Sequence, residues 1–195
     1  MNFVEPIRDR KKIIEIKQYL REKKQLRDLL FIVIGMNTAL RVSDLLKLQI
    51  GDFVDERGNI MSRFWIREEK RGKRQEIIIN DSIRETLGEY LSAYPRITED
   101  PLNFIFFNTR VKGFAKAINR GQAWKILNSI CKRLNITGNF GTHTLRKTWG
   151  YHARLNSVDL ALIMHKFNHN SLAYTKRYLG ITDDELAAVV QKLNL

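Results

Sequence analysis

The chain has 195 residues, and its 34 lysines and arginines against 21 aspartates and glutamates give a formal net charge of +13 at pH 7. A hydrophobic content of 44% excludes a disordered, collagen-like or mucin-like chain, and one cysteine, Cys131, argues against a disulfide-stapled secreted fold or a cysteine-based zinc site. The longest apolar run, residues 29–36, is far shorter than the ~20 residues of a membrane span, so we expect no membrane contact and a cytoplasmic location. The strongly positive net charge predicts a polyanionic partner.

The first third of the chain predicts three helices. Residues 9–23 place apolar side chains at helical spacing among charged ones, which is typical of an amphipathic helix. Residues 26–38 are apolar through their middle and predict a buried helix. Ser43 follows, and we expect it to cap a short helix that runs through Leu48.

The next segment predicts a β-hairpin. Residues 60–66 and 76–79 are rich in aromatic and β-branched side chains, and Arg71-Gly72 between them forms a natural turn. We therefore expect two antiparallel strands joined by a densely basic tip. The tip residues Arg67, Arg71, Lys73 and Arg74 are expected to bind phosphates of a polyanionic partner, of which nucleic acid is the commonest.

Most of the remaining chain is helical in pattern. Residues 81–93 predict a helix capped by Asp81 or Ser82, and residues 104–107 predict a further strand. Beyond Gly121 the helical segments are residues 122–134, 142–155, 157–165, 171–177 and 183–193. The fold class is therefore mainly α with a small antiparallel β-sheet (α+β), in a single domain over residues 1–195.

Two motifs place arginines where a phosphate could bind. Arg41 lies among apolar residues, where a guanidinium needs a ligand or a structural partner such as Asp44 or Glu85. In His143-x-x-Arg146, residues three apart share one helix face and can present an imidazole and a guanidinium to one ligand. The alternative for this second motif is a polar helix start with a solvated arginine.

The third motif is His169, followed nine residues later by Tyr178. A continuous helix would separate the two residues by ~13 Å along its axis, which is too far for both to contact one phosphate. We therefore expect the chain to bend, with His169 in a loop or at a helix start and with the helix ending close to Tyr178.

This ordered set resembles the signature of the tyrosine recombinase (phage integrase) family from about residue 26 to residue 180. The early arginine of the family lies in a Gly-x-x-x-Leu-Arg-x-x-Glu/Asp-Leu context, which is similar to residues 38–45. The hairpin pattern Lys-x-Gly-Lys-x-Arg-x-x-Pro-Leu is similar to residues 70–79. The chain departs from the family where Phe167-Asn168 replaces Leu-Gly, where Ile79 replaces proline, and where the early glycine is displaced.

The resemblance implies a catalytic domain with a defined set of side chains: Arg41, Lys70, His143, Arg146, His169 and Tyr178. The arginines would clamp the scissile phosphate, the histidines would add hydrogen bonds, Tyr178 would attack phosphorus, and Lys70 would protonate the leaving 5′ oxygen. Lys73 competes with Lys70 for the last role, and alignment to the first lysine of the hairpin pattern favours Lys70. We interpret Tyr174 as a packing residue and His165 as a helix-end residue.

The same resemblance implies a site-specific DNA recombinase or integrase of a phage or mobile element, which forms a covalent 3′-phosphotyrosine without a metal or other cofactor. Its partners would be double-stranded DNA and further copies of the chain in a tetrameric synapse, in association with the nucleoid. The amino-terminal core-binding domain of the family is expected to be absent. A type IB topoisomerase and a non-enzymatic DNA-binding regulator remain alternatives, whereas four histidines without a carboxylate cluster disfavour a metal nuclease.

One apolar stripe close to the end of the chain suits docking. Leu186, Val189, Val190 and Leu193 recur at helical spacing within residues 183–193. The stripe is expected to pack on its own domain or, as the resemblance implies, on a neighbouring protomer.

Overall fold

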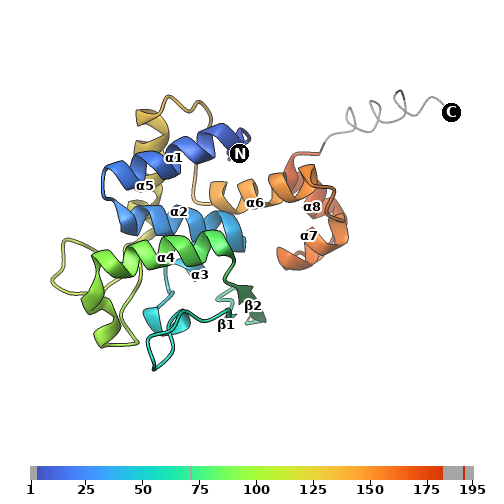
Figure 1. Ribbon diagram of the computed structural model, residues 1–195. Helices are drawn as coiled ribbons and strands as arrows, with labels where there is room; N and C mark the ends of the chain where they lie inside the picture. Colours follow the sequence, from blue (N-terminus) through green and yellow to red (C-terminus); the bar gives the residue numbers. More distant parts are fainter. Residues whose placement is uncertain (1–3, 71, 182–190, 192–195) are drawn as a thin grey trace.

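The computed structural model describes residues 4–70, 72–181 and 191. Helices dominate these residues, and two short antiparallel strands form a small sheet at one side (Figure 1). The predicted fold class, mainly α with a small antiparallel sheet, is therefore confirmed. The predicted helix over residues 183–193 and its apolar stripe lie outside the described residues.

The core is built around one apolar helix, α2 (Leu26–Thr38), whose residues from Leu29 to Met36 are all buried. The amphipathic helix α1 (Arg10–Glu22) packs on one side of α2, and α4 (Asp81–Ala93) and α6 (Thr144–Leu155) pack on others (Figure 1). A Cβ atom at Gly35 of α2 would lie 2.5 Å from the Leu145 side chain. This glycine therefore allows α6 to approach α2 closely.

The hairpin lies beside this core. Strand β1 (Arg63–Arg67) pairs antiparallel with β2 (Arg74–Ile78), so that Phe64 lies opposite Ile77 and both side chains are buried. Residues on either side of this pair face solvent, because successive side chains of a strand point to opposite faces of the sheet. The predicted hairpin is confirmed, with strands shifted by two or three residues at their starts.

Two short helices, α7 (Leu160–Lys166) and α8 (Leu172–Leu179), follow α6 and form a separate corner of the molecule (Figure 1). Their own core is small, because among the described residues it consists of Ala39, Ile163 and Phe167, with partly buried side chains around it. A Cβ atom at Gly150 would lie 2.5 Å from the Phe167 ring, so α6 needs a glycine where this ring packs.

Two predicted helix caps were wrong. The short helix α3 (Val42–Leu45) begins after Arg41, whose backbone is extended, and Ser43 lies inside the helix. Helix α4 is capped by Asn80, whose side-chain oxygen accepts a hydrogen bond from the Ile83 amide. In both cases a residue upstream of the predicted cap has the extended backbone that an N-cap requires.

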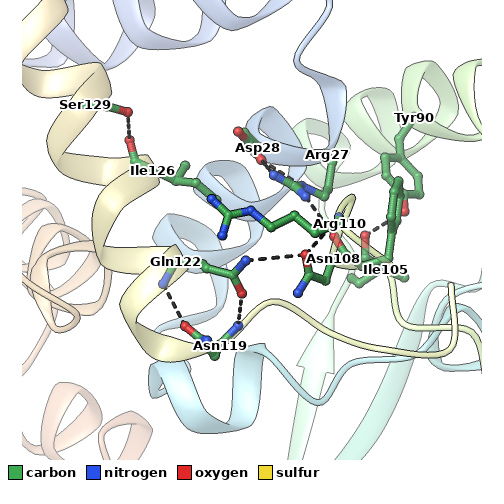
Figure 2. A network of polar contacts seen from close by, with 11 residues as sticks. Arg27, Asp28, Tyr90, Ile105, Asn108, Arg110, Asn119, Gln122, Ile126 and Ser129 are labelled. Carbon is green, nitrogen blue, oxygen red and sulfur yellow. Dashed lines mark hydrogen bonds and ion pairs between the residues drawn. The ribbon is translucent and has the colours of Figure 1, made fainter. Parts of the chain in front are cut away.

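The strand predicted over residues 104–107 is also wrong, because these residues make only isolated bridges: Gln49 with Phe104, and Phe107 with Ala117. Their remaining backbone groups have scattered partners. Figure 2 shows the Tyr90 hydroxyl, which donates to the Ile105 carbonyl at 2.6 Å, so a side chain takes the place of a neighbouring strand.

The same network fixes the start of α5 (Arg120–Arg133) (Figure 2). Arg27 donates to the Phe107 carbonyl, and Asn119 and Gln122 cap each other reciprocally at the first turn of α5. The Gln122 amide also lies 3.4 Å from the Asn108 side-chain oxygen. These contacts hold the amino-terminal end of α5 beside the cleft described below.

Candidate active site

One open cleft of about 660 Å³ gathers residues from the α2–α3 junction, the hairpin tip, the starts of α5 and α6, and the α7–α8 segment. Its lining includes every side chain of the predicted catalytic set: Arg41, Lys70, His143, Arg146, His169 and Tyr178. Most of these residues are distant in sequence. The fold therefore brings the six predicted residues together in one place.

Arg146 lies in the first turn of α6 and is 2% exposed. Its Nη1 donates to the Ala39 carbonyl at 2.6 Å, its Nη2 donates to the Phe167 carbonyl, and its guanidinium lies over the Phe167 ring. Burial lowers the pKa of Arg146 to about 10, so it stays charged at neutral pH. The two carbonyls take two of its five N–H groups and Tyr178 interacts with the same guanidinium, which leaves further N–H groups for a ligand in the cleft.

Arg41 has a different structural partner from the two that the sequence suggested. Its Nη1 lies 2.8 Å from the Glu68 carboxylate as an ion pair, although the N–H direction is not aligned for a hydrogen bond. Asp44 accepts instead from the Glu69 backbone amide at 2.9 Å, and Glu85 pairs with Arg21. Arg41 keeps its place in the lining of the cleft beside this ion pair.

Tyr178 lies near the end of α8 with its hydroxyl 3.2 Å from His143 Nδ1. Burial raises the pKa of Tyr178 to about 12, so the phenol is protonated at neutral pH. Burial, together with the nearby positive charge of Arg146, lowers the pKa of His143 to about 4. A neutral His143 with its proton on Nε2 can therefore accept the phenolic hydrogen at Nδ1.

His169 lies in the turn between α7 and α8, as predicted from the spacing of His169 and Tyr178. Helix α7 ends at Lys166, Asn168 has a left-handed backbone with φ of 49°, and α8 begins at Leu172. The bend places the His169 and Tyr178 rings 5.1 Å apart, and His169 Nδ1 lies 3.1 Å from the buried hydroxyl of Thr175.

The hairpin gives Lys70 and its competitor Lys73 different surroundings. Lys70 lines the cleft, whereas Lys73 lines a neighbouring groove of about 440 Å³ together with His165. This placement favours Lys70. Of the other basic residues predicted at the tip, Arg67 and Arg74 are exposed and face each other across the hairpin, and Arg71 lies outside the described residues.

Sequence reasoning missed three charged residues in or beside the site. Arg120 lines the cleft from the start of α5, and its position next to the Asn119 cap was an available signal. Lys147 follows Arg146 and places its ammonium 4.9 Å from the centre of the Tyr178 ring. Glu68 gave no signal, because the run from Glu68 to Arg74 resembles a solvated hairpin tip.

The described residues show no helix with both the length and the apolar character needed to cross a membrane. Over the same residues, no three histidine, cysteine or acidic side chains are gathered where they could bind a metal ion. The cleft instead gathers several cations and the phenols of Tyr174 and Tyr178, and its cations are suited to binding a phosphate group.

A mainly helical fold that gathers a tyrosine, two histidines, two arginines and a hairpin lysine in one cleft is typical of tyrosine recombinases. The model of the phage integrase family matches residues 8–185, and the chain belongs to that family.

Individual relatives agree with this membership. The chain is 36% identical over 190 residues to the probable integrase/recombinase YoeC of Bacillus subtilis, covering 96% of each protein. It is 29% identical to the tyrosine recombinase XerA of Pyrococcus furiosus, covering 95% of this chain but 59% of XerA. Its fold is similar to that of the XerH site-specific recombinase bound to difH substrate, with a TM-score of 0.73, 20% identity, and coverage of 99% of this chain and 53% of XerH.

Proposed function

We propose that this chain is a site-specific DNA recombinase or integrase that cleaves and rejoins DNA strands through a covalent 3′-phosphotyrosine. The observation that carries the proposal is the 3.2 Å contact between the Tyr178 hydroxyl and His143 Nδ1, in a cleft also lined by Arg41, Arg146 and Lys70. A nucleophile in contact with a neutral base and surrounded by cations suits attack on a phosphodiester. The recombinase names of its relatives support the same reaction.

The first step is the attack of the Tyr178 oxygen on phosphorus. A Tyr–O–P bond forms while the bond from phosphorus to the 5′ oxygen breaks, and the phenolic proton passes to His143. Arg41, Arg146 and His169 stabilise the charge that grows on the non-bridging oxygens. Lys70 gives a proton to the departing 5′ oxygen, which becomes a free hydroxyl.

Rejoining reverses these transfers. A 5′ hydroxyl attacks the phosphotyrosine, its proton returns to Lys70, and His143 reprotonates the Tyr178 oxygen as it leaves. The energy of the phosphodiester is kept in the phosphotyrosine, so the exchange of strands needs no nucleotide cofactor.

Double-stranded DNA is the proposed partner, and the Tn1549 transposon integrase, whose fold is similar, was solved in complex with transposon right end DNA. The exposed arginines Arg67 and Arg74 and the exposed Lys73 would contact phosphates outside the cleft. We further propose that one catalytic domain of this kind acts per DNA strand within a tetrameric synapse and that the protein works at the nucleoid.

The test is trapping of the covalent intermediate. A pool of nicked duplexes of randomised sequence is incubated with the protein in EDTA and resolved by denaturing electrophoresis. The duplexes are designed so that the short fragment carrying the new 5′ hydroxyl diffuses away after cleavage. We expect a protein–DNA adduct whose DNA maps to Tyr178 by peptide mass spectrometry. Binding to the duplexes with no adduct would instead identify a non-enzymatic DNA-binding protein.

The role of Lys70 has its own test, which uses duplexes from the trapped pool with sulfur at the bridging 5′ position. A thiolate leaves without a proton, so Lys70→Ala should cleave this substrate almost as fast as the wild type and fail on ordinary DNA. Lys73→Ala is the matched control and should cleave both substrates normally. Rescue by sulfur in Lys73→Ala alone would assign the general acid to Lys73.

A further inference from the structure

The buried carboxylate of Glu68 has no part in the chemistry above, yet it contacts one of the residues that perform it. We propose that Glu68 is a positioning residue that holds the Lys70 hairpin tip against Arg41. One ion pair then fixes the positions of both the general acid, Lys70, and the phosphate-binding Arg41. This inference rests on the proposed function of the cleft.

Burial distinguishes Glu68 from its neighbour. The Glu68 side chain is 1% exposed, whereas that of Glu69 is 51% exposed and pairs with Lys47 on the surface. A charged carboxylate is costly to bury unless partners replace its lost water. The partners of Glu68 therefore show what the residue stabilises.

Those partners come from three different elements. Oε2 of Glu68 pairs with Arg41 at 2.8 Å, at the α2–α3 junction, and accepts from Asn168 Nδ2 at 2.7 Å, in the α7–α8 turn. Oε1 accepts from the side-chain nitrogen of Gln75 on β2 at 3.2 Å, when that amide is oriented to satisfy its neighbours. One carboxylate thus joins the hairpin to two segments that line the cleft.

The Asn168 contact explains a departure from the family pattern. Position 168 has a φ of 49°, a conformation that glycine adopts freely and that asparagine tolerates better than most residues. Glycine at this position would satisfy the backbone but would offer no amide to Glu68. The asparagine in this chain provides both the backbone conformation and the hydrogen bond.

The position of Glu68 also determines that of Lys70. The Glu68 amide donates to the Lys73 carbonyl at 2.9 Å, and the Gly72 amide donates to the Glu68 carbonyl at 2.8 Å. These bonds close the tip, so Lys70 lies in a short loop whose base is Glu68. The Glu69 amide adds a second tether to Asp44, just after Arg41. A shift of Glu68 would therefore shift Lys70 as well.

The test compares Glu68→Gln, which keeps the shape but removes the charge, with Glu69→Gln as the matched surface control. Single-turnover cleavage is measured on ordinary duplexes from the trapped pool and on the same duplexes with bridging 5′ sulfur. For Glu68→Gln we expect a loss on the order of 10²-fold on ordinary DNA but on the order of 10-fold on the sulfur substrate, where Lys70 is not needed. Glu69→Gln should match the wild type on both.

Equal losses on the two substrates, or no loss, would overturn the proposal. Hydrogen–deuterium exchange gives a readout that needs no DNA: amides of residues 63–78 should exchange faster in Glu68→Gln than in Glu69→Gln, and equal rates would also overturn it. Absence of an adduct with the wild-type protein would reject the proposed function instead. The exchange result would still show whether Glu68 fixes the position of the hairpin. If Glu68→Gln does not fold, Asn168→Gly takes its place as the test variant. This substitution keeps the backbone conformation, and we expect the same pattern of losses on the two substrates, with smaller values.

Discussion

The two parts of the molecule that meet at the cleft are built differently. The arginine Arg41 follows α2, which is buried along most of its length in the main core. The proposed nucleophile, Tyr178, lies on α8, in a corner whose described core has three buried side chains. Elements with few buried apolar contacts open most easily. The phosphate-binding Arg41 therefore lies on the tightly packed main core, and the proposed nucleophile Tyr178 lies on the more loosely packed α7–α8 segment.

Polar contacts join the two parts where apolar packing is thin. Arg146 reaches from the end of α2, at the Ala39 carbonyl, to the Phe167 carbonyl at the end of α7. Glu68 makes a second connection through Arg41 and Asn168. The same charged groups that surround the phosphate site thus hold the nucleophile segment in place.

The largest expected effect comes from removing the nucleophile itself. Tyr178→Phe should abolish the covalent adduct while the affinity for duplex DNA, measured by anisotropy, stays close to that of the wild type, because every phosphate-binding side chain remains. Tyr174→Phe is the matched control, since Tyr174 lies on the same helix and also lines the cleft. An adduct with Tyr178→Phe that disappears in Tyr174→Phe would move the nucleophile to Tyr174.

Breaking the connection at Arg146 is the second prediction. Arg146→Ala should slow cleavage by more than the ~10²–10³-fold that is typical of one lost oxyanion donor, because a charged donor and two structural hydrogen bonds are lost together. Hydrogen exchange should rise in α7 and α8 and stay unchanged in α2. A uniform rise across both parts would show that the molecule opens as one unit.

A pair of glycine substitutions compares the packing of the two parts. Gly150→Ala should lower the free energy of unfolding by about 1–3 kcal/mol, because its Cβ would overlap the Phe167 ring. Gly88→Ala, in the middle of α4, meets nothing within 4 Å and should raise it by about 0.5–1 kcal/mol. Urea denaturation measures both changes, and destabilisation by Gly88→Ala would contradict the interpretation of open space at α4.

The smallest expected effect is a dependence of stability on pH. The pKa of His143 is lowered from 6.5 to about 4 in the folded protein, so the unfolded chain binds more protons between these values. The resulting stabilisation is present above pH 6.5 and is lost as the pH falls toward 4. Over that range the wild type should lose about 1 kcal/mol more of its free energy of unfolding than His143→Gln, given partial solvent screening. Parallel curves for the two proteins would show that His143 titrates normally.

Local patterns in the sequence determined most of the fold class and the set of site residues. The periodicity of α1, α2 and α4 predicted these helices, because burial of one face follows the 3.6-residue turn wherever the helix packs. The spacing of His169 and Tyr178 predicted a bend, because helix geometry limits what two residues nine apart can contact. The six candidate site residues were identified through the resemblance to a family, which rests on several short motifs in a fixed order along the chain.

Only the tertiary structure decided the contacts between those motifs. Nothing in the run around Glu68 shows that its carboxylate is buried against Arg41, because the pairing depends on where the hairpin docks and not on its own residues. Alignment to the hairpin pattern favoured Lys70 over Lys73, but the different surroundings of the two lysines depend on how the hairpin docks. Residues 104–107 form no strand because their backbone groups bond to scattered partners, among them the Tyr90 hydroxyl, instead of to one neighbouring strand. The sequence specifies which groups need partners, and long-range packing determines which partner each group receives.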